Sequence, residues 1–143
     1  MNAPFDLNRF VEVQEDLFPQ ALAEIKNGRK ESHWMWFIFP QIAGLGISSL
    51  SQKYAIRGKD EAVAYLQHHI LGPRLKEITT ILLELEGKST FEIFGNIDTM
   101  KLKSSMTLFA MVSPENSPFH LVLERYFAGE RDSRTLDILM KQE

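Results

Sequence analysis

The chain has 143 residues and a formal net charge of −3 at pH 7, with 44% hydrophobic and 24% charged residues. This composition is typical of one globular domain, since a chain of this length buries roughly two thirds of its unfolded surface. The charge gives no reason to expect a broad nucleic-acid-binding surface, and the absence of cysteine excludes disulfides, thiolate metal sites and thiol nucleophiles. The apolar runs are too short to span a membrane and the first ten residues lack a signal peptide, so we expect a cytoplasmic protein without a membrane partner.

Helical periodicity dominates the first third of the chain. Residues 5–11 predict a short amphipathic helix, and apolar residues between 17 and 25 predict a second helix that ends at Asn27-Gly28. Residues 37–40 favour an extended segment or a short helix ended by proline, and a strand, if there is one, is expected over residues 36–39. Gly44 and Gly46 then predict a loop, and the serine pair at 48–49 predicts the cap of a short helix. An alternative is that this loop and the two serines cradle a phosphate, although the segment matches neither the dinucleotide-binding nor the Walker motif.

Further helices are predicted from residue 60 to the C-terminus. Asp60 is the expected N-cap of a helix over 61–70, and the next helix has apolar residues at helical spacing from 71 to 85. The remaining predicted helices cover residues 91–94, stopped by Gly95 and capped by Ser89 or Thr90; 99–111, capped by Asp98; 119–127; and 135–141, capped by Asp132 or Ser133. Together these signals predict an all-α fold, a compact bundle of six to eight short helices that forms one domain over residues 1–143.

Residues 32–41 contain both tryptophans of the chain and two phenylalanines. One interpretation is a core segment, because burial of one large apolar side chain contributes roughly 1.5–3 kcal/mol. The other is a ligand pocket, in which Trp34 or Trp36 stacks on a planar ligand while His33 and Gln41 make polar contacts.

The predicted helix over 99–111 carries small hydroxyl residues among apolar ones. Asp98, Lys101 and Ser105 share one face of it, and Ser104 lies on another. In the functional interpretation Lys101 binds an anion, and Ser104, Ser105 or Thr107 donates hydrogen bonds to the ligand. In the structural interpretation the hydroxyls bond back to the preceding turn of the helix.

Other sequence patterns carry weaker chemical signals. His33, Asp98 and Ser105 supply the residue types of a nucleophilic triad, but no Gly-x-Ser-x-Gly elbow is present. The four histidines form no metal-binding motif, so no metal site is predicted and any cofactor stays unknown. Arg74, in the first turn of a helix, is either a further anion ligand or the partner of Glu77 in a salt bridge.

Several segments resemble the signatures of a bacterial family of unknown function. They are GRK at 28–30, SHWMWFIFPQ at 32–41, GLG at 44–46, LGPRL at 71–75, IFG at 93–95 and DTMKLKSSMTLF at 98–109. The resemblance implies a small, mainly helical single domain and assigns no catalytic residue. His69 departs from it, since many relatives have proline there. Some members carry the label calpastatin, the name of a disordered eukaryotic inhibitor, whereas this composition is that of a folded domain.

Two functional hypotheses from different classes follow. In the first, the polar motif residues converge on one pocket walled by Trp34, Trp36 and Phe39, which takes a nucleotide-like or other anionic small molecule. With His33 as general acid or base and Asp98 assisting, such a pocket would suit a hydrolase or transferase. In the second, the chain is a non-enzymatic protein-interaction module, which could be a homodimer. The aromatic motif, residues 32–41, is then purely structural.

Overall fold

The computed structural model describes residues 5–142, so residues 1–4 and 143 of the predicted domain lie outside the described part. The described residues form eight helices: α1 Asn8–Lys26, α2 Met35–Ile38, α3 Ser49–Lys53, α4 Lys59–Gln67, α5 Leu71–Glu84, α6 Thr90–Ala110, α7 Pro118–Phe127 and α8 Ser133–Lys141. Between residues 5 and 142 there is no strand, only an isolated parallel bridge from Ile42 to Ile56. The prediction of an all-α, single-domain bundle is confirmed, and none of the described helices is long and apolar enough to cross a lipid bilayer.

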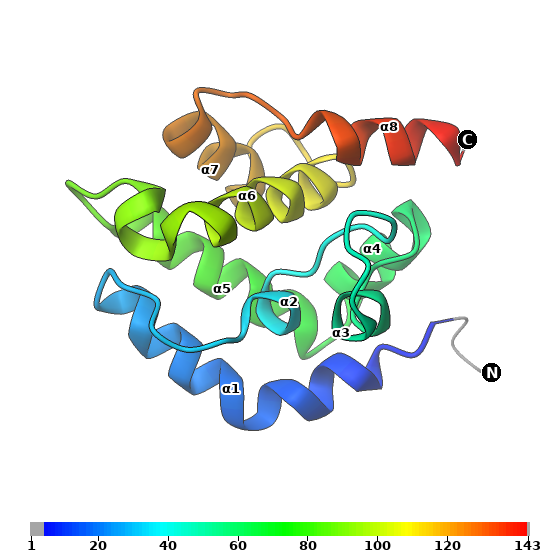
Figure 1. Ribbon diagram of the computed structural model, residues 1–143, viewed down its shortest axis with the longest axis horizontal. Coiled ribbons are helices and arrows are strands. Elements are labelled where there is room, and N and C mark those ends of the chain that lie inside the picture. The colour runs from blue at the N-terminus through cyan, green and yellow to red at the C-terminus, as the bar shows by residue number, and fades with distance from the viewer. Residues whose placement is uncertain (1–4, 143) are drawn as a thin grey trace.

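The helices pack around α5 and α6. In Figure 1, α1 lies along one edge of the molecule and α7 and α8 lie along the opposite edge. Helix α5 packs on α1, α4 and α7, whereas α6 packs on α2, α4, α7 and α8. The largest fully buried side chains belong to Trp34, Tyr65, Phe10, Phe39, Phe109 and Phe119. The core is therefore largely aromatic, and two of its members come from the aromatic motif.

Helix α1 is one helix of 19 residues, although two shorter ones were predicted. Its buried residues Phe10, Gln14, Phe18, Ala21 and Ile25 lie on one continuous face. That face packs on α5, and its burial outweighs the local cost of Pro19 inside the helix. The predicted stop is confirmed, since Gly28 follows the helix with a left-handed φ of 75°.

The junction between α4 and α5 differs from the predicted caps. Gly58, rather than Asp60, is the N-cap of α4, and Asp60 lies in the first turn. At the start of α5, Nδ1 of His68 accepts hydrogen bonds from the N–H groups of Ile70 (3.1 Å) and Leu71 (3.3 Å). A Cβ on Gly72 would lie 2.1 Å from the carbonyl oxygen of Leu66, so only glycine allows this close approach of the two helices.

Helix α6 joins the two helices that were predicted on either side of Gly95. Ser89 caps it in a reciprocal capping box with Glu92, as one of the two predicted alternatives. Gly95 has φ 81° and ψ 175°, which kinks the helix at the predicted stop. The helix resumes before Asp98, so this residue lies inside α6 and the prediction that it is an N-cap is wrong.

Candidate functional site

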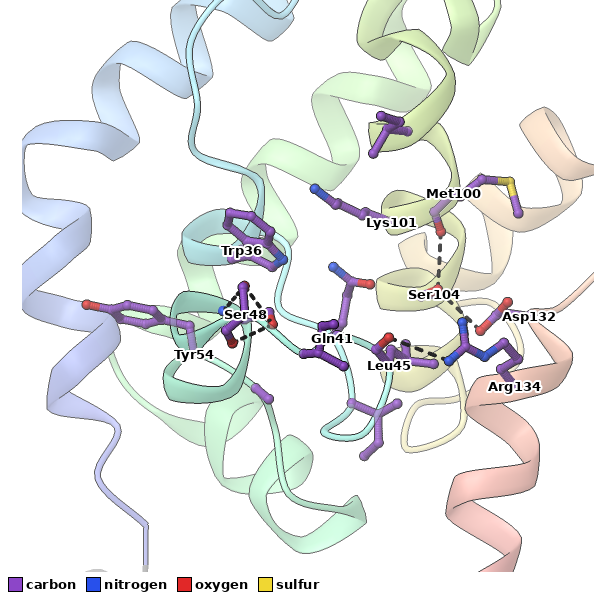
Figure 2. Close-up of a pocket in the computed structure, with 16 residues that line it drawn as sticks. Trp36, Gln41, Leu45, Ser48, Tyr54, Met100, Lys101, Ser104, Asp132 and Arg134 are labelled. Carbon is purple, nitrogen blue, oxygen red and sulfur yellow. Dashed lines mark hydrogen bonds between the residues drawn. The ribbon is translucent and has the colours of Figure 1, made fainter.

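A pocket of about 570 Å³ opens between the segment from Gln41 to Ala55, the middle of α6 and the start of α8 (Figure 2). Its volume falls within the range of roughly 300–1,000 Å³ that is usual for small-molecule sites. The segment is held at its base by the hydrogen bonds Ala43 N–H to Ile56 O (2.7 Å) and Ile56 N–H to Gln41 O (2.8 Å). Between these bonds the chain turns through Gly44, which has a φ of 105°, and forms α3.

Lys101 brings positive charge to the pocket. Its Nζ lies 4.2 Å from the centroid of the Trp36 ring and 3.5 Å from Oδ1 of Asp98. The other carboxylate oxygen of Asp98 forms a shorter ion pair, 2.7 Å, with Nζ of Lys30, whose side chain is only 7% exposed. One carboxylate thus serves two ammonium groups, and Lys101 is the less tightly held of the two.

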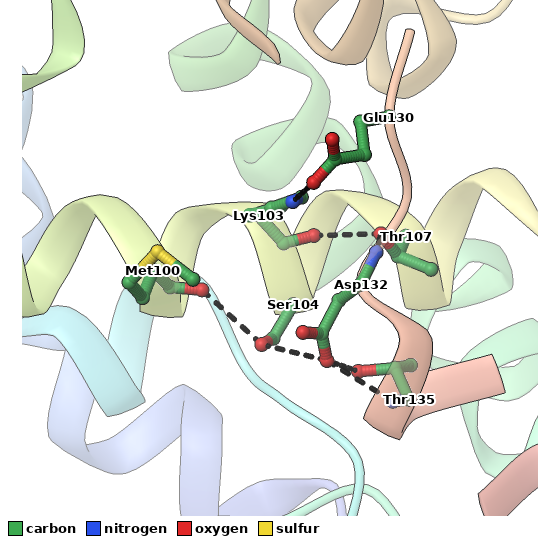
Figure 3. Close-up of polar contacts among 7 residues, drawn as sticks. All are labelled: Met100, Lys103, Ser104, Thr107, Glu130, Asp132 and Thr135. Atoms are coloured by element: carbon green, nitrogen blue, oxygen red, sulfur yellow. Dashed lines mark hydrogen bonds and ion pairs between the residues drawn. The ribbon is translucent and has the colours of Figure 1, made fainter. Parts of the chain in front are cut away.

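Ser104 and Asp132 line the pocket on the side of α8. Ser104 Oγ lies 3.2 Å from both Met100 O and Asp132 Oδ2 (Figure 3). Asp132 Oδ2 also accepts hydrogen bonds from the backbone N–H (3.0 Å) and the hydroxyl (2.6 Å) of Thr135, which makes Asp132 the predicted cap of α8. Arg134, in the first turn of α8, lies 3.5 Å from Leu45 O through Nη2.

Hydroxyl groups of α6 also fix the chain before α8. Thr107 Oγ1 donates to Lys103 O (2.8 Å) and accepts from the backbone N–H of Asp132 (2.9 Å), and Lys103 pairs with Glu130 (Figure 3). Ser104 and Thr107 therefore make the bonds to the preceding turn that the structural interpretation predicted. They additionally hold α8 against α6 and so set the position of Asp132.

The remaining lining is mostly apolar. Ile42 and Tyr54 are buried in the wall, whereas three large apolar side chains at the mouth are exposed: Ile47 by 93%, Ile97 by 73% and Met100 by 54%. Ile47 belongs to the loop before α3, and the other two lie on α6. The pocket thus combines a few charged and polar groups with an apolar wall, and its most exposed lining side chains are apolar.

Four of the predicted ligand-binding residues line this one pocket: Trp36, Gln41, Lys101 and Ser104. Figure 2 shows the Gln41 amide between Lys101 and Arg134, and this amide forms no hydrogen bond with the described residues. Their convergence comes from the packing of α2 and α8 on α6. Their roles as ligand contacts stay predictions.

Trp34 and Phe39 do not wall the pocket as expected, because both side chains are fully buried in the core. The indole N–H of Trp34 donates to Oε1 of Glu24 over 2.9 Å. The same carboxylate accepts hydrogen bonds from the backbone N–H groups of Glu31 (2.7 Å) and Ser32 (3.0 Å) and from the Ser32 hydroxyl (2.6 Å). Glu24 therefore anchors the start of the aromatic motif to α1.

This carboxylate has a strongly perturbed pKa. Burial raises the pKa of Glu24, but the hydrogen bonds from Ser32, Glu31 and Trp34 outweigh that effect and lower it from 4.5 to about 2. Glu24 is thus held ionised by the segment that it anchors.

Arg74 and Ser105 also lie outside the pocket lining. Arg74 faces α1, where its Nη1 is 3.4 Å from Oε1 of Gln14 and its guanidinium lies over the Phe18 ring. Gln14 is buried, and its Nε2 donates to Phe37 O (2.7 Å) and to the Tyr65 hydroxyl (3.0 Å). Ser105 is fully buried, and its hydroxyl has no hydrogen-bond partner among the described residues. Both residues are placed by core packing rather than at the pocket.

The predicted catalytic pair is not assembled in the pocket. His33 is exposed and is not among the lining residues. The residues on either side of it, Ser32 and Trp34, are hydrogen-bonded to Glu24 on α1. Asp98 lies beside the pocket, paired with two lysines. No group of three or more histidine, aspartate or glutamate residues suited to a metal ion occurs within residues 5–142.

Sequence analysis missed four polar lining residues as ligand contacts: Ser51, Tyr54, Asp132 and Arg134. Asp132 was identified only as a helix cap, whereas Ser48 was predicted as a cap or as part of a phosphate-binding turn. Both are caps, and Ser48 accepts from Ser51 N–H over 3.1 Å. Their second position, at a pocket, depends on how α3 and α8 meet α6, for which the sequence holds no local signal.

Comparison with known proteins gives a family and one solved relative. Residues 4–139 match the model of the family described as "Protein of unknown function (DUF1810)". The crystal structure of the conserved hypothetical protein Rv1873 from Mycobacterium tuberculosis is similar, with 48% sequence identity and a TM-score of 0.94 over 96% of this chain and 99% of that one. No curated protein matches the chain. These findings confirm the resemblance to a bacterial family of unknown function.

Proposed function

The chain belongs to the DUF1810 family of proteins of unknown function, and we propose that its pocket binds a small anionic molecule with a planar ring, nucleotide-like ligands among them. The observation that carries the proposal is the position of Lys101. Its ammonium group lies in the pocket, over the Trp36 ring and at 3.5 Å from a carboxylate that Lys30 already engages at 2.7 Å.

The charges around Lys101 favour an anion. Asp98 is the carboxylate partner of both Lys30 and Lys101, so these three groups together carry a net charge of +1, and the contact to Lys101 is the longer of the two. At 4 Å and an effective dielectric constant of about 20, an anion and a cation attract each other by about 4 kcal/mol before desolvation costs. Lys101 would supply this attraction to a ligand anion in the pocket.

The uncharged lining supplies the remaining contacts of such a ligand. The amide of Gln41 is free to donate or accept, and Trp36 and Tyr54 offer aromatic walls to a ring. An apolar cavity with a few convergent polar groups is the usual form of a small-molecule site. Hydrolysis or group transfer has less support, since His33 lies outside the pocket and Asp98 is engaged by lysines.

Tryptophan fluorescence during titration tests the proposal. We expect nucleoside monophosphates or aromatic carboxylates to change the emission of Trp36, and Lys101→Met to weaken binding about tenfold, which is a loss of about 1.4 kcal/mol. Lys141→Met, at an exposed lysine on α8 outside the pocket, is the matched control and should bind as the parent does. Equal affinity of both variants, or no response to any anion while the fold is intact, would reject the proposal.

The alternative of a protein-interaction module has one observation in its favour, the exposed apolar residues at the mouth. If they form an interface between two copies, the chain sediments as a dimer and Ile97→Ser shifts it to the monomer. A monomer at all concentrations, together with ligand binding, supports the pocket instead.

A further inference from the structure

We infer that the ligand of this pocket is an apolar monoanion, a single carboxylate on an aromatic or aliphatic body, rather than a nucleotide polyphosphate. The inference rests on the proposed function, because it names the class of anion that the pocket would take. Two independent features of the lining carry it, the number of its charges and the exposed side chains at its mouth.

The charges of the lining fit one negative group. Among the described residues that line the pocket, Lys101 and Arg134 are the cations and Asp132 is the anion. Asp132 cannot turn away without loss, since its Oδ2 accepts hydrogen bonds from Ser104 and twice from Thr135. Its charge would offset one cation and repel the second and third charges of a polyphosphate, whereas a monoanion needs only Lys101.

The mouth of the pocket favours an apolar body. Ile47, Ile97 and Met100 are 93%, 73% and 54% exposed and belong to two facing elements, the loop before α3 and helix α6. A ribose or a phosphate chain would leave these side chains uncovered. A hydrocarbon body would cover them, with about fourfold tighter binding for each buried methylene group.

Gln41 provides the contact for the anionic group itself. Its amide, which has no hydrogen bond to the described residues, lies between the two cations of the pocket (Figure 2). An amide N–H and the Lys101 ammonium can donate to the two oxygens of one carboxylate. The interior therefore suits a carboxylate with its body directed toward the mouth.

Calorimetric titration of a matched ligand series tests the inference. We expect 2-naphthoate to bind at least tenfold more tightly than 2-naphthamide, which has the same shape without the charge, and more tightly than benzoate, which has a smaller body. Adenosine triphosphate should bind less tightly than adenosine monophosphate. In the protein, Lys101→Met should abolish the preference for naphthoate over naphthamide.

The mouth residues are tested separately. Ile97→Ser and Met100→Ser change exposed side chains, so the fold should be kept, and each should weaken naphthoate binding several-fold more than benzoate binding. Met140→Ser, at an exposed methionine on α8 outside the pocket lining, is the control and should change neither. If the adenosine phosphates bind in a Lys101-dependent way while naphthoate does not, or if the triphosphate binds more tightly, the inference is overturned and the proposed function stands. If no anion binds, the inference and the proposed function are both rejected.

Discussion

Replacement of Glu24 by glutamine removes the group that holds the aromatic motif on α1. The Glu24 carboxylate accepts four hydrogen bonds at 2.6–3.0 Å, from Ser32 twice, Glu31 and Trp34, and a longer one of 3.3 Å from Gln20. A glutamine amide has the same shape and its oxygen can keep the three N–H bonds made to Oε1, but its NH₂ group then replaces Oε2, which accepts from the Ser32 hydroxyl and from Gln20 Nε2, and the negative charge is lost. We therefore expect Glu24→Gln to fold but to have a lower free energy of unfolding.

The magnitude follows from the pKa. The folded pKa of Glu24 is about 2, against an ordinary value of 4.5, and each pKa unit corresponds to about 1.4 kcal/mol. The difference sets a ceiling of about 3 kcal/mol, and because the carboxylate is partly exposed to solvent, we expect about 1–2 kcal/mol. Since the folded pKa is lowered, this contribution is complete above pH 4.5 and is lost as the pH falls toward 2.

Urea unfolding of the parent and of Glu24→Gln, at pH 7 and at intervals down to pH 3, measures this contribution. At pH 7 the variant should unfold at a urea concentration lower by about 1 M. The gap between the two proteins should narrow below pH 4.5, because the parent then takes up the proton that the variant lacks. Glu15→Gln, at an exposed position of the same helix, is the control and should unfold with the parent.

Two results would refute the reasoning. A gap of the same size at pH 7 and pH 3 would show that the loss comes from packing of the amide and not from the carboxylate charge. Equal stability of Glu24→Gln and Glu15→Gln would show that the four hydrogen bonds contribute nothing net.

Three further substitutions test other parts of the fold by the same urea assay. Gly72→Ala should cost about 2–4 kcal/mol, because its Cβ would lie 2.1 Å from Leu66 O, and an unchanged midpoint would contradict that contact. Gln14→Leu should cost about 2 kcal/mol by leaving the buried Tyr65 hydroxyl without its donor, and a stable variant would mean that this network is dispensable. Ser105→Ala should cost nothing and gain up to about 1 kcal/mol, since its buried hydroxyl is unpaired within residues 5–142; a clear loss would reveal a bond to this hydroxyl.

Local signals predicted most helix boundaries because caps and stops act within a few residues. The caps at Ser89 and Asp132 and the left-handed glycine at Gly28 are confirmed, and each needs only its own neighbours in the chain. The division of α1 was wrong because the mostly polar residues 12–16 interrupt the apolar periodicity, whereas the buried face that continues through Gln14 is stabilised by contacts with a distant helix.

The candidate site was predictable in part. Trp36, Gln41, Lys101 and Ser104 lie in one pocket, and all were selected as polar or aromatic residues of specific motifs. The same criterion also selected Trp34, Arg74 and Ser105, which face the core or α1. Residue type therefore identified the segments that form the pocket but not which of their side chains point into it.

The sequence by itself determined that this chain is a single all-α domain and which motifs are unusual, because composition, periodicity and caps are properties of the chain. Only the tertiary structure showed that Trp36 and Ser104 line the pocket, whereas Trp34 and Ser105 are fully buried. Successive residues of a helix point about 100° apart, so neighbours of the same type meet different surroundings. Which of them meets solvent depends on helices from distant parts of the chain, and here residues of α3, α6 and α8 line the same pocket.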